Sequence, residues 1–139
     1  MSIDQLSKYV FLVWDQSGKF AEDIWIIPQI LSIHVVHNTG IAFGIDMGRI
    51  PLLIVTSVGL ALVGYLWKSD PFRQKSLVKF GYVSILSGAF SNAFDRFTFG
   101  YVVDFLSIRH FAVCNIADVA ITLGVGLLIL AQIRYARTK

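Results

Sequence analysis

The feature that most constrains this chain is an uncharged run of 18 residues from Ile50 to Trp67. A helix of that length rises about 27 Å, close to the thickness of the hydrocarbon core of a bilayer. Composition agrees, because 55% of the 139 residues are hydrophobic and 15% are charged, whereas soluble domains carry about 25% charged residues. We therefore expect an integral membrane protein with a single domain over residues 1–139.

Two further apolar runs predict two more transmembrane helices. Residues 80–94 carry no charge, and Leu77 and Val78 extend that run. Its many small residues predict close packing against other helices. Residues 113–133 are interrupted only by Asp118. An acid near the start of a membrane span is costly and therefore marks a candidate functional position.

The placement of basic residues orients these spans. The segment 68–79 and the C-terminal tail hold seven of the twelve Lys and Arg residues, and the positive-inside rule predicts that both are cytoplasmic. The segments 15–49 and 95–112 then face outward. Within the first, residues 24–36 are rich in Ile and Val, which predicts one or two short strands of a small sheet on the outer membrane face, ended by a turn at Asn38-Thr39-Gly40.

Polar residues gather at the outer ends of the second and third spans: Asn92, Asp95, Arg96, Asp104, Asn115 and Asp118. Two carboxylates held close together can share one proton, since both cannot ionise easily. The ionised acid can then activate water, while the protonated acid polarises a peptide carbonyl. This is aspartic-protease chemistry, which requires neither a metal nor a nucleophilic side chain.

Other interpretations of the same residues stay open at this point. Asn115 and Asp118 have the spacing of a helix N-cap and its third-position acid. The acids with Arg96 fit a proton or ion relay in a small non-enzymatic transporter, although such a relay needs polar residues across the whole bilayer. The pairs His34/His37 and His110/Cys114 weakly match a metal site and a thiol–imidazole pair.

Four motifs occur in order along the chain: NTGIAFG at 38–44, GAFSNAFDR at 88–96, GYVVDF at 100–105 and NIAD at 115–118. With them the sequence resembles the bacterial lipoprotein signal peptidases, the signal peptidase II family. The resemblance implies that Asp104 and Asp118 are the catalytic pair. It also implies five residues that shape the site and contact substrate: Asn38, Asn92, Asp95, Arg96 and Asn115.

The resemblance further implies a substrate, a topology and a location. The substrate would be a bacterial prolipoprotein whose lipobox cysteine carries diacylglycerol, cut just before that cysteine. Asp4 and Lys8 resemble a motif that closes the family's first transmembrane helix, and three residues precede Asp4, so most of that helix is expected to be missing. Cys114 stands where the family commonly has Phe.

The expected fold is thus a mainly α membrane protein with three full transmembrane helices, a partial N-terminal helix and a small extracytoplasmic β-sheet. We expect a multi-pass protein of the bacterial inner membrane with its active site at the extracytoplasmic face. Its partners are the prolipoprotein and membrane lipids. No metal or cofactor is expected, and the few, scattered basic residues argue against nucleic acid. A monomer is expected.

Overall fold

The computed structural model describes residues 2–17, 23–40 and 48–136. Its elements in chain order are α1 (Ser2–Gln16), β1 (Ile24–Ile27), β2 (Leu31–Asn38), α2 (Arg49–Ser69), α3 (Ser76–Thr98), β3 (Val102–Ile108), β4 (Val113–Cys114) and α4 (Ile116–Ala136). Residues 41–44 of the first motif lie outside the described residues.

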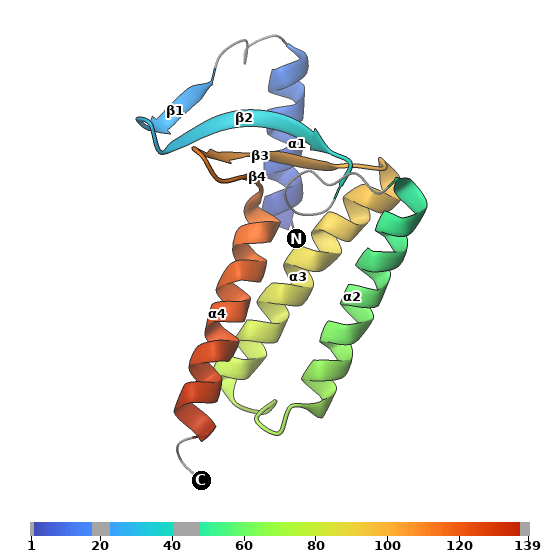
Figure 1. Cartoon of the computed structure of the whole chain (residues 1–139), viewed down its shortest axis with the longest axis vertical. Coiled ribbons are helices and arrows are strands. Elements are labelled where there is room, and N and C mark those ends of the chain that lie inside the picture. Colours follow the sequence, from blue (N-terminus) through green and yellow to red (C-terminus); the bar gives the residue numbers. More distant parts are fainter. Residues whose placement is uncertain (1, 18–22, 41–47, 137–139) are drawn as a thin grey trace.

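The small sheet lies across one end of three long helices (Figure 1). Helices α2, α3 and α4 extend from it in roughly one direction, and α1 runs alongside the sheet. We call the helix ends near the sheet the sheet end and the opposite ends the far end. The α2–α3 connection and the C-terminal end of α4 both lie at the far end. The basic segment 68–79 and Arg134 therefore share one end, as charge placement predicted; the rest of the basic tail lies outside the described residues.

The sheet is antiparallel throughout, with its strands in the order β1-β2-β3-β4. Strands β1 and β2 occupy the Ile- and Val-rich segment, so the predicted small sheet is confirmed. The other two strands were not predicted. Strand β4 takes the first two residues of the expected third span, and α4 begins only at Ile116. The helix starts there because Asn115 caps it, as the site geometry below explains.

Among the described residues, two helices, α2 and α4, are long and apolar enough to cross a membrane. Helix α2 has one buried residue, Leu52, so most of its apolar surface faces outward. Helix α3 is the longest, at 23 residues, but Ser, Asn and Gly lower its hydropathy. It lies between α2 and α4 (Figure 1). The predicted partial N-terminal helix corresponds to α1, which continues to Gln16, well beyond Asp4 and Lys8.

Glycines allow α3 and α4 to pack with their backbones close together. A Cβ placed on Gly88 would lie 2.4 Å from the carbonyl oxygen of Ala117, and one on Gly124 would lie 2.6 Å from that of Gly81. Real side chains never approach a backbone atom this closely. The Gly88 contact lies one turn from Asn92 and one residue from Asp118, so it sets the helix separation at the sheet end.

We expect Gly88→Ala to destabilise the protein by about 1–3 kcal/mol, because the added methyl must push α3 and α4 apart. Gly126→Ala is the matched control, since a Cβ there meets nothing within 4 Å. Thermal unfolding in detergent measures both. An equal loss in the two variants would mean that close helix packing at Gly88 is not what the glycine provides.

Candidate active site

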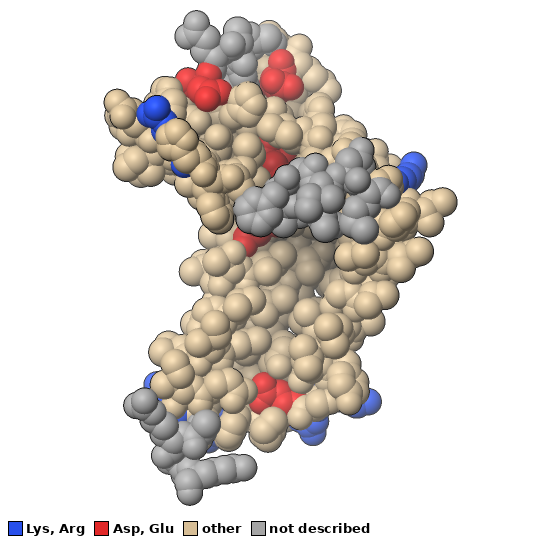
Figure 2. All heavy atoms as spheres, in the orientation of Figure 1, with Lys and Arg blue, Asp and Glu red and all other residues tan. Residues whose placement is uncertain are grey.

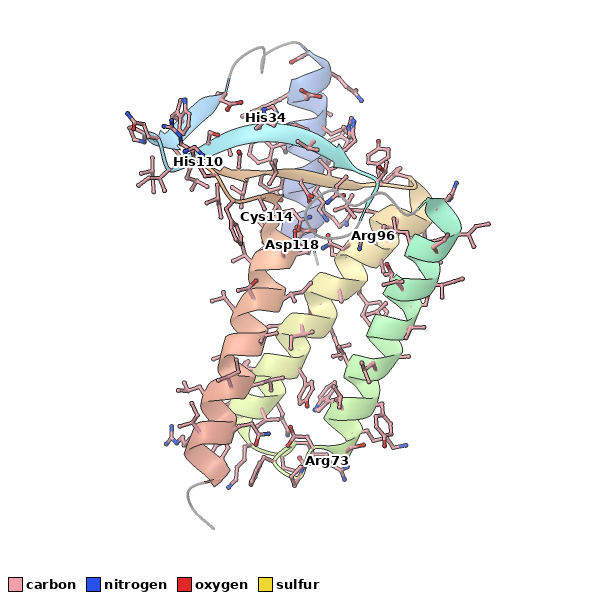
Figure 3. All side chains as sticks on the ribbon, viewed as in Figure 1. His34, Arg73, Arg96, His110, Cys114 and Asp118 are labelled. Carbon is pink, nitrogen blue, oxygen red and sulfur yellow. The ribbon has the colours of Figure 1, made fainter. Side chains whose placement is uncertain are left out.

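A cavity of about 540 Å³ lies where the sheet meets α3 and α4. Five of the predicted site residues line it: Asn38, Asn92, Arg96, Asp104 and Asp118. These come from four elements that are far apart in the sequence, and five of the seven predicted site residues are thereby brought together. Figure 3 shows Arg96, Cys114 and Asp118 at this level of the molecule, just below the sheet.

Strand β3 delivers Asp104 to the cavity. Residues alternate between the two faces of a strand, and Phe105 faces α1, where its ring stacks on Phe11 at 4.4 Å. Asp104 and Val102 therefore share the opposite face, and both line the cavity. Strand β2 pairs Asn38 with Val102, which brings the Asn38 amide to within 2.8 Å of the Asp104 carboxylate.

Asp104 is buried, with 2% of its surface exposed. Burial raises the pKa of its carboxyl to about 6, and the nearby Asp118 charge adds to the rise. Two amide donors, Asn38 Nδ2 at 2.8 Å and Asn115 Nδ2 at 2.6 Å, oppose it because they stabilise the ionised form. Desolvation outweighs both donors, so Asp104 holds a proton more readily than an ordinary aspartate.

Asp118 lies in the first turn of α4, and Asn115 is the cap of that helix. The Asp118 backbone N–H donates to Asn115 Oδ1 at 3.0 Å, while the Asn115 backbone N–H donates to Asp118 Oδ2 at 3.2 Å. This reciprocal pair is a capping box, so the simple capping interpretation is correct. It also leaves Asp118 Oδ1 directed at Asn92, and the positive end of the helix dipole favours its negative charge.

Two asparagine amides link the aspartates. Asn115 Nδ2 donates both to Asp104 Oδ1 and, at 3.1 Å, to Asn92 Oδ1. Asn92 Nδ2 in turn donates to Asp118 Oδ1 at 2.8 Å. The resulting chain of contacts runs Asp104–Asn115–Asn92–Asp118. It holds both carboxylates rigidly against the same cavity, and each retains lone pairs that can bind water or a substrate carbonyl.

Behind this chain lies a buried ionic cluster. Lys8 Nζ contacts Asp4 Oδ2 and Asp95 Oδ2, each at 2.7 Å, and donates to Asn92 Oδ1 at 2.8 Å. Its side chain is 4% exposed. Asp4 accepts from Ser91 Oγ and from the Ala117 backbone N–H at the start of α4. The cluster therefore ties α1 to α3 and α4 directly behind the aspartates.

Asp95 belongs to this cluster and does not line the cavity, so of its two predicted roles its position suits shaping the site rather than contacting substrate. It accepts from Gln5 Nε2 at 2.8 Å and faces Lys8. The contacts of Gln5 with Asp95 and of Ser91 with Asp4 were not predicted. Gln5 gave no signal, because an isolated Gln is usually a surface residue.

Arg96 does line the cavity. One of its terminal nitrogens, Nη2, donates to the Gly40 carbonyl at 3.3 Å. Its Nε is buried and has no hydrogen-bond partner among the described residues. The guanidinium thus places a fixed positive charge beside the two acids.

The other constellations considered in the sequence do not assemble. His34 pairs with Asp23 at 2.8 Å on the sheet, whereas the His37 ring packs on Tyr101. His110 contacts Arg109. Burial raises the pKa of the Cys114 thiol, which lowers its reactivity as a nucleophile. Among the described residues, no group of three His, Cys, Asp or Glu side chains is placed to hold a metal.

Comparison with known proteins identifies the family. The family model described as signal peptidase (SPase) II matches residues 1–134. The chain belongs to the signal peptidase II family. It is 38% identical to the lipoprotein signal peptidase of Trichormus variabilis over 136 residues, covering 95% of this chain and 83% of that protein. It is 37% identical to the enzyme of Bartonella henselae over 140 residues, covering 96% and 83%.

Two solved structures of bacterial membrane enzymes share the fold of this chain. One superposes with a TM-score of 0.81 at 30% identity, covering 99% of this chain and 84% of that one. The other gives 0.68 at 27% identity, covering 97% and 95%. The predicted family, the peptidase class and the mainly helical membrane fold with a small sheet are thereby confirmed.

Proposed function

We propose that the enzyme removes the signal peptide from bacterial prolipoproteins, cutting just before a cysteine that carries diacylglycerol. The observation that carries this proposal is the shared cavity in which Asp104 and Asp118 are cross-linked by Asn92 and Asn115. A single water held by both carboxylates would lie beside the scissile carbonyl.

The proposed reaction uses the two aspartates in different protonation states. Asp118, whose carboxylate accepts hydrogen bonds from the Asn92 amide and the Asn115 backbone N–H, takes up a proton from the water. Asp104, which readily holds a proton, donates a hydrogen bond to the carbonyl oxygen. The water oxygen bonds to the carbonyl carbon, and the carbon–nitrogen bond breaks as the cysteine nitrogen takes up a proton. Arg96 offsets the negative charge of the pair.

The remainder of the cavity fits an apolar substrate. Beyond its polar residues, the lining is largely aliphatic and aromatic: Val102, Ile108, Phe111, Val113, Val119, Ile121 and Leu123. Three of these lie on the first two turns of α4, which is apolar enough to span a membrane. A signal-peptide helix and acyl chains could therefore enter sideways from the lipid, while the polar residues face the peptide bond.

The proposed topology follows the same geometry. Helices α2, α3 and α4 are three full spans, and the far end is cytoplasmic. Helix α1 is the partial N-terminal helix: its first turns contact α3 and α4, and the rest runs beside the sheet. The sheet and the active site then lie at the extracytoplasmic face of the inner membrane. Helix α3 spans despite its polar residues, because they face α1 and α4 rather than lipid: Ser91, Asn92 and Asp95 are all buried.

A synthetic precursor peptide in detergent micelles tests the proposed substrate. We expect cleavage before the lipobox cysteine when it carries diacylglycerol, and little or none when the thiol is unmodified, with products located by mass spectrometry. Equal cleavage of both peptides would contradict the lipid requirement, whereas cleavage at another bond would contradict the proposed position.

The pH dependence of kcat/KM should report the Asp104 proton. Since the pKa of this carboxyl is raised to about 6, the protonated form is present below that pH and is lost above it. We expect kcat/KM to fall about tenfold per pH unit above about 6, because this parameter reports the free enzyme. Initial rates over pH 5–8 measure it.

Asn38→Ala should move the fall of kcat/KM to higher pH. The Asn38 amide stabilises ionised Asp104, so its removal raises the pKa of Asp104 further. Thr39→Ala is the control, because Thr39 neighbours Asn38 in the chain but makes no hydrogen bond to Asp104. If the fall of kcat/KM moves to lower pH in Asn38→Ala, or moves by the same amount in both variants, its assignment to the Asp104 proton is contradicted.

A further inference from the structure

A second cavity, of about 510 Å³, lies at the far end of the helices. We define it as the basic cavity; its lining is Gly64, Trp67, Lys68, Arg73, Gln74 and Lys79. It thus combines three cationic side chains with an amide and an indole, and no acid takes part. Figure 3 shows Arg73 at this end, remote from the labelled residues of the active site. Figure 2 shows Lys and Arg side chains gathered there.

The three cations of the basic cavity converge from different segments. Lys68 lies in the last turn of α2, Arg73 in the connection, and Lys79 in the first turns of α3. Arg73 Nη1 donates to the Lys68 carbonyl at 2.5 Å, which fixes the guanidinium against the end of α2. None of the three forms an ion pair with a carboxylate in the part of the chain that the structure describes.

Asp70, the acid nearest in sequence, does not neutralise them. Its Oδ1 accepts from the Phe72 backbone N–H at 2.7 Å, and its Oδ2 accepts from Tyr82 Oη at 3.2 Å. Asp70 is therefore turned inward and is 9% exposed. Beside it the Trp67 and Tyr82 rings stack at 6.0 Å, so a packed aromatic group supports the cavity.

We propose that the basic cavity binds the phosphodiester headgroup of an anionic phospholipid. In the proposed topology it lies at the cytoplasmic membrane surface, where a basic pocket between helices suits such a headgroup. Topology alone requires only that positive charge remain on this face. Topology does not require three cations to share one cavity with an indole. An indole side chain favours the interfacial region of the membrane.

A headgroup bound in the basic cavity would link α2 to α3. Helix α2 has one fully buried residue, Leu52, and the phosphate would add a link from Lys68 on α2 to Lys79 on α3. Bound lipid should therefore raise the unfolding temperature, because a ligand that binds only the folded state stabilises it.

Titration of the detergent-purified full chain with phosphatidylglycerol, followed by native mass spectrometry, tests the proposal. We expect tighter binding than for phosphatidylcholine with the same acyl chains. Lys79→Gln and Lys68→Gln should each weaken phosphatidylglycerol binding about fivefold. Lys75→Gln is the matched control: it removes one charge from the same connection, but Lys75 lies over the Tyr135 ring at 5.7 Å and does not line the cavity.

Three results would overturn the proposal. The first is equal binding of the two lipids, and the second is equal weakening by Lys75→Gln, which would indicate diffuse charge attraction. The third is full displacement of the lipid by millimolar inorganic phosphate, which would indicate a site for a soluble anion. Unchanged helical content verifies that the variants fold, and the test does not depend on peptidase activity.

Discussion

Asp104→Asn and Asp118→Asn are each expected to lower the cleavage rate of a diacylglyceryl-modified precursor by at least about a thousandfold. An amide at either position can neither take a proton from water nor share one with the other acid. The overall fold should be retained, since Asn is nearly isosteric with Asp. Cleavage assays on purified variants give the rates, and circular dichroism verifies helical content.

Two further variants sharpen this test. Asp23→Asn makes the same chemical change just before β1, where Asp23 is 42% exposed and pairs with His34, and it should leave the rate within about twofold. The double variant Asp104→Asn/Asp118→Asn should be about as inactive as either single variant, because residues that act as one unit are not additive. Substantial turnover in either single variant would exclude the proposed mechanism.

Much of the fold followed from the distribution of charge in the sequence. The run from Ile50 to Trp67 lies within α2, and the run from Phe80 to Phe94 lies within α3. Such runs are reliable signals because a charge inside a bilayer is costly. The Ile- and Val-rich segment formed strands for a related reason, since β-branched residues fit a pleated, half-buried surface.

Strand β3 was not predicted, because it is buried on both sides. Val102, Val103, Asp104 and Phe105 are all buried, so the strand lacks the alternation of polar and apolar residues that identifies a half-exposed strand. Its central acid made the segment resemble a loop at the end of a span. Strand β4 has two residues, too few for any pattern.

The residues of the active site were predicted more completely than the buried ionic cluster behind them. Asp104 and Asp118 were among three acids near apolar runs, together with Asn92 and Asn115, and the family resemblance singled out the pair and added Asn38. The contact of Lys8 with Asp95 joins α1 to the end of α3, and nothing local in the sequence pairs residues so far apart. Asp4 and Lys8 are spaced as an ordinary helical ion pair, which gives no indication that three helices converge on them.

The buried cluster of Lys8, Asp4 and Asp95 also orients a side chain of the active site. The Lys8 ammonium faces two buried carboxylates and the Asn92 amide oxygen at once. Two acids so little exposed, Asp4 at 3% and Asp95 at 2%, would repel each other strongly without it. The same contact fixes the orientation of the Asn92 amide, so that its nitrogen faces Asp118. Lys8 is thus a positioning residue that acts on Asp118 through Asn92.

Lys8→Met is therefore expected to destabilise the protein by about 3–5 kcal/mol, the usual cost of leaving a buried charge without its partner. Thermal unfolding measures the loss. Lys75→Met, the same change at an exposed side chain, should alter stability by no more than about 0.5 kcal/mol. A comparable loss in both variants would mean that the charge of Lys8 is not what matters.

The triple variant Lys8→Met/Asp4→Asn/Asp95→Asn separates the effect of Lys8 on stability from its effect on kcat. Because it removes both carboxylates with the ammonium, it should recover most of the lost stability. Its kcat should remain about tenfold below the parent, since a single misplaced contact can cost that much, while Asn115 still holds Asn92 in part. Full recovery of both stability and kcat would show that Lys8 only neutralises charge and that the orientation of Asn92 does not depend on it.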